Sequence, residues 1–183
     1  MNCKIIDIHT HIYPVALARR AMEVTGQEHD DFKNLPIREN LLTRMQDAGV
    51  TLSVNLPVVS KPQNQAEVNR FAKESARKNI IPFGGLHPDC ENVVEELEKL
   101  KDMGMAGIKF HPPFQKVHLE DPKYEEMWRR INALGFPVLI HCGTAKIARP
   151  YDLYPSGVRK ILKYAPDIPI LSLIHISEHT RPY

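Results

Sequence analysis

Short apolar segments rich in β-branched residues recur along this 183-residue chain at nearly constant spacing. They span residues 4–12, 51–57, 80–86, 107–110, 137–141 and 168–170. From the second segment onward, they begin 29, 27, 30 and 31 residues apart. This regularity is typical of repeated strand–helix units, whose strands form a parallel sheet.

The segments between the predicted strands carry apolar residues at helical spacing. The predicted helices span residues 38–48, 64–78, 92–103 and 121–134. Each is followed by a residue that tolerates a positive φ angle, as helix C-termini often require; these residues are Gly49, Asn79, Gly104 and Gly135. The first unit is longer than the others, and we expect residues 13–37 to form an elaborate loop beside any active site.

A parallel sheet can stay open or close into a barrel, and periodicity does not distinguish the two. A dinucleotide-binding open sheet needs a glycine-rich turn after its first strand, but this chain has HTHIYP there. A full (β/α)8 barrel usually needs about 250 residues. The sequence therefore predicts an α/β fold: an incomplete TIM-like (β/α)8 barrel at residues 1–170, with about six of its eight βα units.

Composition excludes several classes of protein. The net charge is +2, and no basic block is dense enough to follow a nucleic-acid backbone. The three cysteines lie far apart and form no CxxC pair, which disfavours a disulfide framework or a zinc ribbon. No apolar run is long enough for a signal peptide or a membrane span. We therefore expect a cytoplasmic protein that binds neither nucleic acid nor membrane.

Histidines end two of the predicted strands. The first strand closes with DIHTH, and because alternate residues of a strand face the same side, His9 and His11 point in one direction. In a parallel barrel that direction is the interior, at the mouth where active sites lie. The fifth strand ends at His141. Three neutral nitrogens suit a catalytic zinc ion; the alternative is a set of structural histidines in a polar rim.

Four segments together resemble the amidohydrolase superfamily: IDIHTHIYP, GLHPD, GIKFHPPFQ and VLIHCG. The resemblance covers residues 1–170 and is strongest to the branch that includes aminocarboxymuconate-semialdehyde decarboxylase-like enzymes. It implies a divalent metal, most often zinc with manganese as an alternative, held by His9, His11 and His141. It also implies a catalytic aspartate on an eighth strand and a histidine on the sixth. Neither is assigned here, so the catalytic residues stay unknown.

The fourth predicted strand, GIKFHPP, places Lys109 and His111 on one face. Lys109 is expected to contact an anionic substrate. The alternatives are a structural ion pair with a buried carboxylate such as Asp7, or the carbamylated, metal-bridging lysine of some superfamily members. His111 and His87 are expected to line the substrate pocket. The alternative for His87 is a turn histidine hydrogen-bonded to backbone.

Residues 171–183 do not fit the pattern. They read LSLIHISEHTRPY, which resembles the translated sequencing-adaptor segment LSLIHISEPTR except at His179. We predict a non-native tail there, so His175 is not taken as the sixth-strand histidine. The alternative is a genuine, divergent terminus.

The sequence thus predicts an amidohydrolase-type enzyme in which a metal-activated water hydrolyses a C–N or C–O bond of a small molecule. The first alternative is a metal-dependent decarboxylase of a small unsaturated carboxylic acid. The second, of another class, is an inactive fragment or a metal-binding module, because two absent strands would expose two sheet edges. We expect the 183-residue chain to lack turnover, and a homodimer of the full-length parent is left open.

Overall fold

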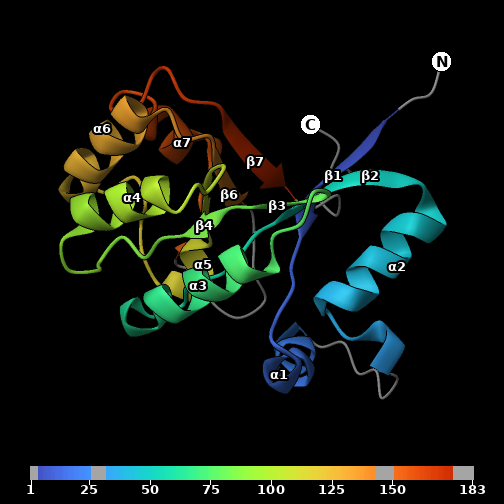
Figure 1. The fold of residues 1–183 in the computed structure, drawn as a ribbon. Coiled ribbons are helices and arrows are strands. Elements are labelled where there is room, and N and C mark those ends of the chain that lie inside the picture. The colour runs from blue at the N-terminus through green and yellow to red at the C-terminus, as the bar shows by residue number, and fades with distance from the viewer. Residues whose placement is uncertain (1–3, 26–31, 143–150, 175–183) are drawn as a thin grey trace, which may run out of the picture.

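Parallel strands in chain order form the centre of the molecule (Figure 1). The computed structural model describes residues 4–25, 32–142 and 151–174. The strands are β1 Ile5–Thr10, β2 Val50–Asn55, β3 Ile80–Pro82, β4 Gly84–Gly85, β5 Ile108–Phe110, β6 Val138–Cys142 and β7 Ile170–Ile174. They pair in the orders β1-β2-β3 and β4-β5-β6-β7, and every pair is parallel.

β3 and β4 are two halves of one strand that bonds to different neighbours. β3 pairs with β2 as far as Pro82, and β4 pairs with β5 from Gly84 onward. Between them, the Phe83 N–H donates to the carbonyl oxygen of Asn55 at 3.1 Å. The Gly84 N–H donates to the carbonyl oxygen of Gly107 at 2.8 Å. The two ladders therefore continue each other, and the six predicted strands are confirmed in their predicted order.

β7 extends further than the sequence predicts. It pairs with β6 from Val138 opposite Ile170 to Cys142 opposite Ile174. Its last four residues thus belong to the segment predicted to be a non-native tail. Residues 175–183, including His175, lie outside the described ranges, and the assignment of this segment stays a prediction.

Helices connect the strands much as the periodicity predicts. They are α1 Val15–Thr25, α2 Arg38–Ala48, α3 Gln65–Ser75, α4 Val93–Asp102, α5 Pro112–Gln115, α6 Glu125–Leu134 and α7 Pro155–Ile161, with short 3-10 helices at Phe32–Asn34, Pro62–Asn64 and Pro122–Tyr124. α2 and α6 end at Gly49 and Gly135, whose φ angles of 68° and 66° glycine adopts without strain.

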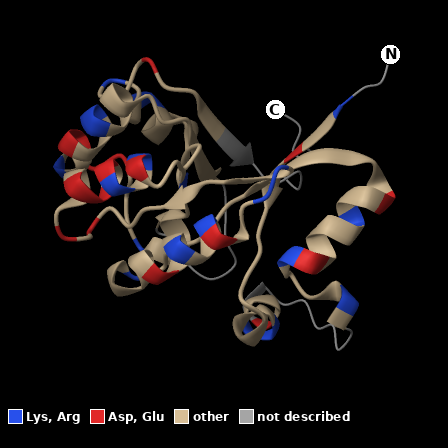
Figure 2. Ribbon diagram, in the orientation of Figure 1, with Lys and Arg blue, Asp and Glu red and all other residues tan. Residues whose placement is uncertain are grey.

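Charged residues of both signs are interspersed on the outer helices, most visibly on α4 and α6 (Figure 2). The exposed ion pairs Arg70–Glu74 and Arg129–Glu125 each join residues four positions apart on one helix face. This is the mixed, solvated surface that the composition indicates. Within the described ranges, no helix combines the length and apolar character that crossing a membrane requires.

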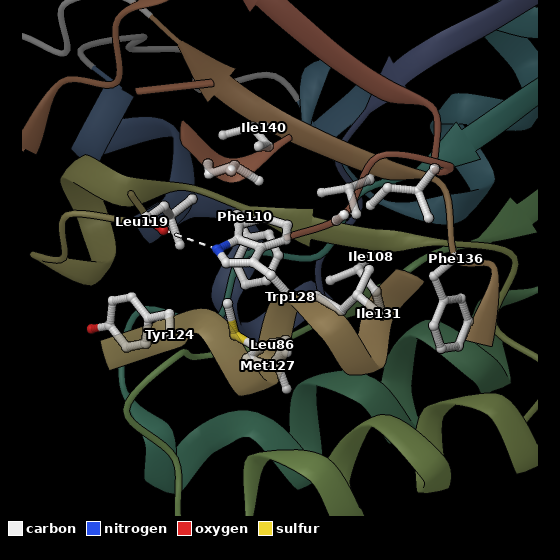
Figure 3. Close-up of a cluster of buried hydrophobic side chains, with 14 of the residues drawn as sticks. Leu86, Ile108, Phe110, Leu119, Tyr124, Met127, Trp128, Ile131, Phe136 and Ile140 are labelled. Atoms are coloured by element: carbon white, nitrogen blue, oxygen red, sulfur yellow. Dashed lines mark hydrogen bonds between the residues drawn. The ribbon is translucent and has the colours of Figure 1, made fainter. Parts of the chain in front are cut away.

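The main hydrophobic core lies between β4–β7 and the helices α4, α6 and α7 (Figure 3). Trp128 is fully buried at its centre, and its ring lies 5.4 Å from that of Phe110. The indole N–H donates to the carbonyl oxygen of Leu119 at 2.9 Å, so burial leaves no polar atom of Trp128 unsatisfied. Trp128 is therefore a fully satisfied core residue of α6.

The first part of the chain is packed less completely. Residues of α1 and of the segment before α2 form a small separate core of Ala18, Met22, Leu35 and Ile37. On β1, the side chains of Ile5, Ile6 and Ile8 remain 48%, 52% and 40% exposed. The apolar surface of β1 is therefore largely uncovered, whereas β6 is buried along its whole length.

Candidate metal centre

The side chains of His9, which lies in β1, and of His11, which follows β1, converge on one point. Nε2 of His9 lies 3.0 Å from Nε2 of His11, and the two rings are nearly perpendicular at 73°. With zinc–nitrogen distances of about 2.0–2.1 Å, a 3.0 Å separation corresponds to a nitrogen–zinc–nitrogen angle of roughly 90–100°. The predicted pairing of these side chains is present, and its geometry fits two ligands of one ion.

The backbone fixes which nitrogen of His11 can bind a metal. Nδ1 of His11 lies 2.6 Å from the carbonyl oxygen of Leu56, which can only accept a hydrogen bond. Nδ1 therefore carries the proton, and the lone pair resides on Nε2, which faces His9. Burial, followed by the positive charge of Lys109, lowers the pKa of His11 to about 3. His11 is thus a neutral imidazole with its free nitrogen directed at the shared point.

His141, the third predicted ligand, is the fourth residue of β6 and is buried. It lies within electrostatic reach of His11, since its charge contributes to lowering the pKa of His11. Across residues 4–25, 32–142 and 151–174, however, no three histidine, cysteine or acidic side chains form a group that could hold one ion. The structure therefore brings together His9 and His11, and His141 as their third ligand stays a prediction.

Lys109, the middle residue of β5, is 1% exposed. Its Nζ has no hydrogen-bond partner among the described residues. The ion pair with Asp7, one of the alternatives from sequence, is not formed; the Asp7 carboxylate instead accepts the backbone N–H of His9 at 3.0 Å. Burial lowers the pKa of Lys109 to about 7. The Lys109 amine, which makes no hydrogen bond among the described residues, therefore lies within electrostatic reach of His11 and His111.

His111, which directly follows β5, is also buried and lies against His141. The two imidazoles are 4.1 Å apart and 9° from parallel. Burial, followed by the charge of His141, lowers the pKa of His111 to about 2, so His111 is neutral. Its Nδ1 has no hydrogen-bond partner among the described residues. His111 therefore lies against His141, and the contact of Lys109 and His111 with substrate stays a prediction.

His87 has the contacts of a structural residue. Its Nδ1 accepts the backbone N–H of Asp89 at 3.2 Å, and its ring also contacts the backbone of Gln115. Its own N–H donates to the side chain of Gln65 at 2.8 Å. Burial lowers the pKa of His87. These bonds match the turn-histidine alternative, and they leave its ring little capacity for a substrate.

Sequence reasoning missed three buried amides that hold the strand ends. Asn69 of α3 binds both the N–H and the carbonyl of Gly85, at 2.7 and 2.8 Å. Gln65 receives the N–H of His87, and Gln115 bonds to three loops. Gln115 ends the GIKFHPPFQ motif, but amides carry no periodic pattern that would mark them as buried.

A cavity of about 360 Å³ lies between β1 and α2. Asp7, Thr10 and His11 line one side of it, and Asn40 and Arg44 line the other. Its lining includes neither His141 nor Lys109. It therefore borders His11 without reaching the buried lysine.

Comparison with known proteins identifies the family. A family model described as Amidohydrolase matches residues 6–177. The chain belongs to this amidohydrolase family. A search of curated protein sequences finds no significant match.

Solved structures show the fold of this amidohydrolase. One is an uncharacterized TIM-barrel protein of Bordetella bronchiseptica, with TM-score 0.68 and 17% identity over 93% of this chain and 66% of that one. Another is the 4-oxalomesaconate hydratase of Rhodopseudomonas palustris, with a TM-score of 0.61 and 21% identity, covering 92% of this chain and 62% of that one. A third is the 5-carboxyvanillate decarboxylase of Sphingomonas paucimobilis, with a TM-score of 0.59 and 13% identity, covering 92% of this chain and 67% of that one.

At these identities the likeness concerns the fold alone. It confirms the predicted class, a partial α/β barrel of the TIM type. The chain spans 57% to 67% of the length of these and similar solved structures.

Proposed function

We propose that this chain is the metal-binding part of an enzyme that acts on a small carboxylic acid. The observation that carries the proposal is the His9–His11 pair, whose Nε2 atoms lie 3.0 Å apart while Leu56 fixes the tautomer of His11. We assign His141 as the third ligand, as the family resemblance implies. A bound divalent metal, zinc or manganese, would acidify water and polarise a carbonyl group.

Lys109 is the group that would recognise a carboxylate. Its amine is buried, lacks a partner among the described residues and lies within electrostatic reach of His11. A carboxylate brought close to it would raise its pKa back toward the ordinary value of about 10.4. Substrate binding and protonation of Lys109 would therefore reinforce each other. His111, which is neutral, would contribute shape and hydrogen bonds rather than charge.

Hydrolysis of a C–N or C–O bond is the first candidate reaction. The substrate carbonyl would then lie against the histidine pair, with a remote carboxylate on Lys109. Decarboxylation of an unsaturated acid is the second candidate, a reaction named for one of the solved proteins that share this fold. In that case the carboxylate itself would lie between the histidines and Lys109.

The test measures metal content and turnover together. The 183-residue chain is purified with zinc or manganese, beside the same chain extended by the C-terminal portion of one of the longer proteins of this fold. Both are assayed on lactones, amides and unsaturated carboxylic acids. We expect about one tightly bound metal ion in the extended chain and turnover of at least one substrate class. We expect no turnover from the 183-residue chain, because most side chains of β1 are exposed to solvent.

The results separate the three classes of function. Metal binding without turnover by the extended chain would favour a metal-binding module. A lack of metal in both proteins would contradict the proposed site. Turnover that persists after complete removal of metal would show that the histidine pair serves another purpose.

A further inference from the structure

One amide side chain joins three loops at the carboxyl ends of the strands. Gln115 is 4% exposed, and its Oε1 accepts the backbone N–H of His111 at 2.9 Å. Its Nε2 donates to the carbonyl oxygens of Leu86 at 2.7 Å and Val59 at 3.1 Å. These three partners follow β5, β4 and β2. Both donors of the amide are used, so its orientation is fixed.

The loops are packed tightly where Gln115 binds them. A Cβ atom on Gly85, at the end of β4, would lie 2.6 Å from Cγ2 of Val59. Real Cβ atoms do not approach so closely, so glycine is needed there. The position of the backbone around Gln115 is therefore restricted on more than one side.

The short helix α5 brings the side chain of Gln115, its last residue, back to His111, the residue that precedes the helix. The carbonyl oxygen of His111 accepts the N–H groups of Phe114 and Gln115, both at 3.0 Å. Pro112 and Pro113 occupy the first helical positions, where their fixed φ angle favours the turn. His111 is thus held from two directions, through its carbonyl by α5 and through its N–H by Gln115.

His111 lies between two rings. Its imidazole is 4.1 Å from the ring of Phe114, at 23°, and 4.1 Å from that of His141, at 9°. Two rings cannot occupy the same face of one imidazole at this distance, so Phe114 and His141 cover opposite faces. The ring of His141 cannot rotate about its Cβ–Cγ bond without displacing His111. The plane of His141 therefore depends on where His111 is held.

We infer that Gln115 is a positioning residue that sets the ring orientation of His141 through His111. The consequence for metal binding rests on the proposed function, in which His141 is a ligand. Removing a residue that orients a metal ligand without binding the metal itself typically weakens metal binding about 10–100-fold. The positioning itself concerns this chain's own residues and can be measured without metal.

The test compares Gln115→Met with Asn69→Leu. Each variant removes a buried amide that binds strand-end backbone, but Asn69 binds only Gly85 among the described residues. Ring signals of His141 are followed by NMR in metal-free protein, assigned with His141→Gln, and thermal unfolding is recorded in parallel. We expect Gln115→Met to shift the His141 signals, which lie over the face of His111, and Asn69→Leu to leave them in place. Unchanged His141 signals in Gln115→Met would overturn the inference.

A zinc titration then tests the consequence. We expect Gln115→Met to bind zinc about 10–100-fold more weakly than the unmodified chain, and Asn69→Leu to bind it equally well. If the unmodified chain binds no zinc, the proposed function fails, while the NMR result still decides the role of Gln115. Equal zinc affinity in Gln115→Met and the unmodified chain would overturn the consequence for metal binding, while the His141 ring signals decide the positioning role.

A second pair of variants covers the case in which Gln115→Met does not fold. Gln115 binds the backbone of His111, so substitutions of the His111 side chain keep that bond. His111→Phe retains a flat ring between Phe114 and His141, and we expect near-normal zinc affinity. His111→Leu removes the ring, and we expect at least a tenfold loss. Equal affinities in these two variants would count against a positioning stack.

Discussion

Nδ1 of His11 lies 2.6 Å from the carbonyl oxygen of Leu56, the residue that follows β2. The bond joins the ends of two neighbouring strands, because the Leu56 N–H also donates to the carbonyl oxygen of Thr10 at 2.8 Å. Since the acceptor is a backbone atom, no side-chain substitution at position 56 removes it. The tautomer of His11, and hence its free Nε2, is a property of the fold.

His9→Gln and His11→Gln should each weaken zinc binding strongly. Each removes one of two nitrogens that lie 3.0 Å apart. We expect losses larger than the ~10–100-fold that follows from removing an outer partner of a ligand. Competition with a chromophoric chelator measures the affinity. His118→Gln is the matched control, because His118 is exposed. Wild-type affinity in both His9→Gln and His11→Gln would exclude the pair as ligands.

Lys109→Met should remove a pH dependence of stability in metal-free protein. The folded-state pKa of Lys109 is about 7, below the unfolded value of about 10.4. Between these values the unfolded chain binds more protons, so this residue makes stability rise with pH, by at most about 1.4 kcal/mol per pH unit. The free-energy cost of burying the charged amine of Lys109 is therefore present in full below pH 7 and absent above about pH 10.4. We therefore expect Lys109→Met to be at least as stable as the unmodified chain at pH 7.

Denaturant titrations from pH 6 to 10 measure this difference, and Lys73→Met, on the surface of α3, serves as the control. A large loss of stability in Lys109→Met would mean that the lysine has a structural partner. In an active, extended chain, the same substitution should raise KM or abolish turnover if Lys109 binds the substrate carboxylate.

His87→Ala should destabilise the fold without affecting zinc. The imidazole accepts the N–H of Asp89, and its removal leaves that donor without its partner. The expected cost is about 1–3 kcal/mol. Chemical denaturation and zinc titration of the same preparation measure both quantities. Normal stability combined with weaker substrate binding would instead support a substrate contact.

Asp89→Asn should lower stability only above acidic pH. Burial raises the pKa of Asp89, but the hydrogen bonds from Tyr124 and Lys123 outweigh this, and the pKa is lowered overall. The stabilisation is therefore present above the unfolded pKa of about 3.9 and is lost as pH falls through the folded value. Lys123 and Asp89 are both exposed, so we expect about 0.2–1 kcal/mol at pH 7. Thermal unfolding should show a lower stability of Asp89→Asn than of the unmodified chain at pH 7 but not at pH 2. An equal difference in stability at both pH values would contradict the charge-based account.

The fold was predictable because its elements repeat. Strand spacing and helical periodicity place α2 at residues 38–48, as observed. Local structure that depends on partners was not predictable. α3 ends at Ser75 rather than near Asn79, because Arg77 and Ile80 form a bridge that requires a turn. The division of the third strand at Phe83 reflects which neighbour each backbone group reaches, and side-chain patterns do not encode this.

The site was predictable where geometry follows from alternation along a strand. His9 and His11 converge as alternation predicts, and His111 lies against His141 because β5 pairs with β6. The contacts that fix these groups were not predictable. The Leu56 carbonyl, the Asn69 amide and the Gln115 amide act across strands that are far apart in sequence. For Lys109, sequence alone left an ion pair with Asp7 open, and Asp7 instead binds the backbone of His9.

The uneven packing of the molecule places the candidate ligands in regions of different local stability. His9 and His11 belong to the part with a small core and an exposed β1, whereas His141 belongs to the strand that the main core buries. Local opening of β1 would therefore separate the histidines without unfolding β6. A zinc ion bound by all three would oppose this opening, because it binds only the closed arrangement. Amide protons of β1 should then exchange with solvent quickly in the metal-free chain and at rates approaching those of β6 once zinc is bound.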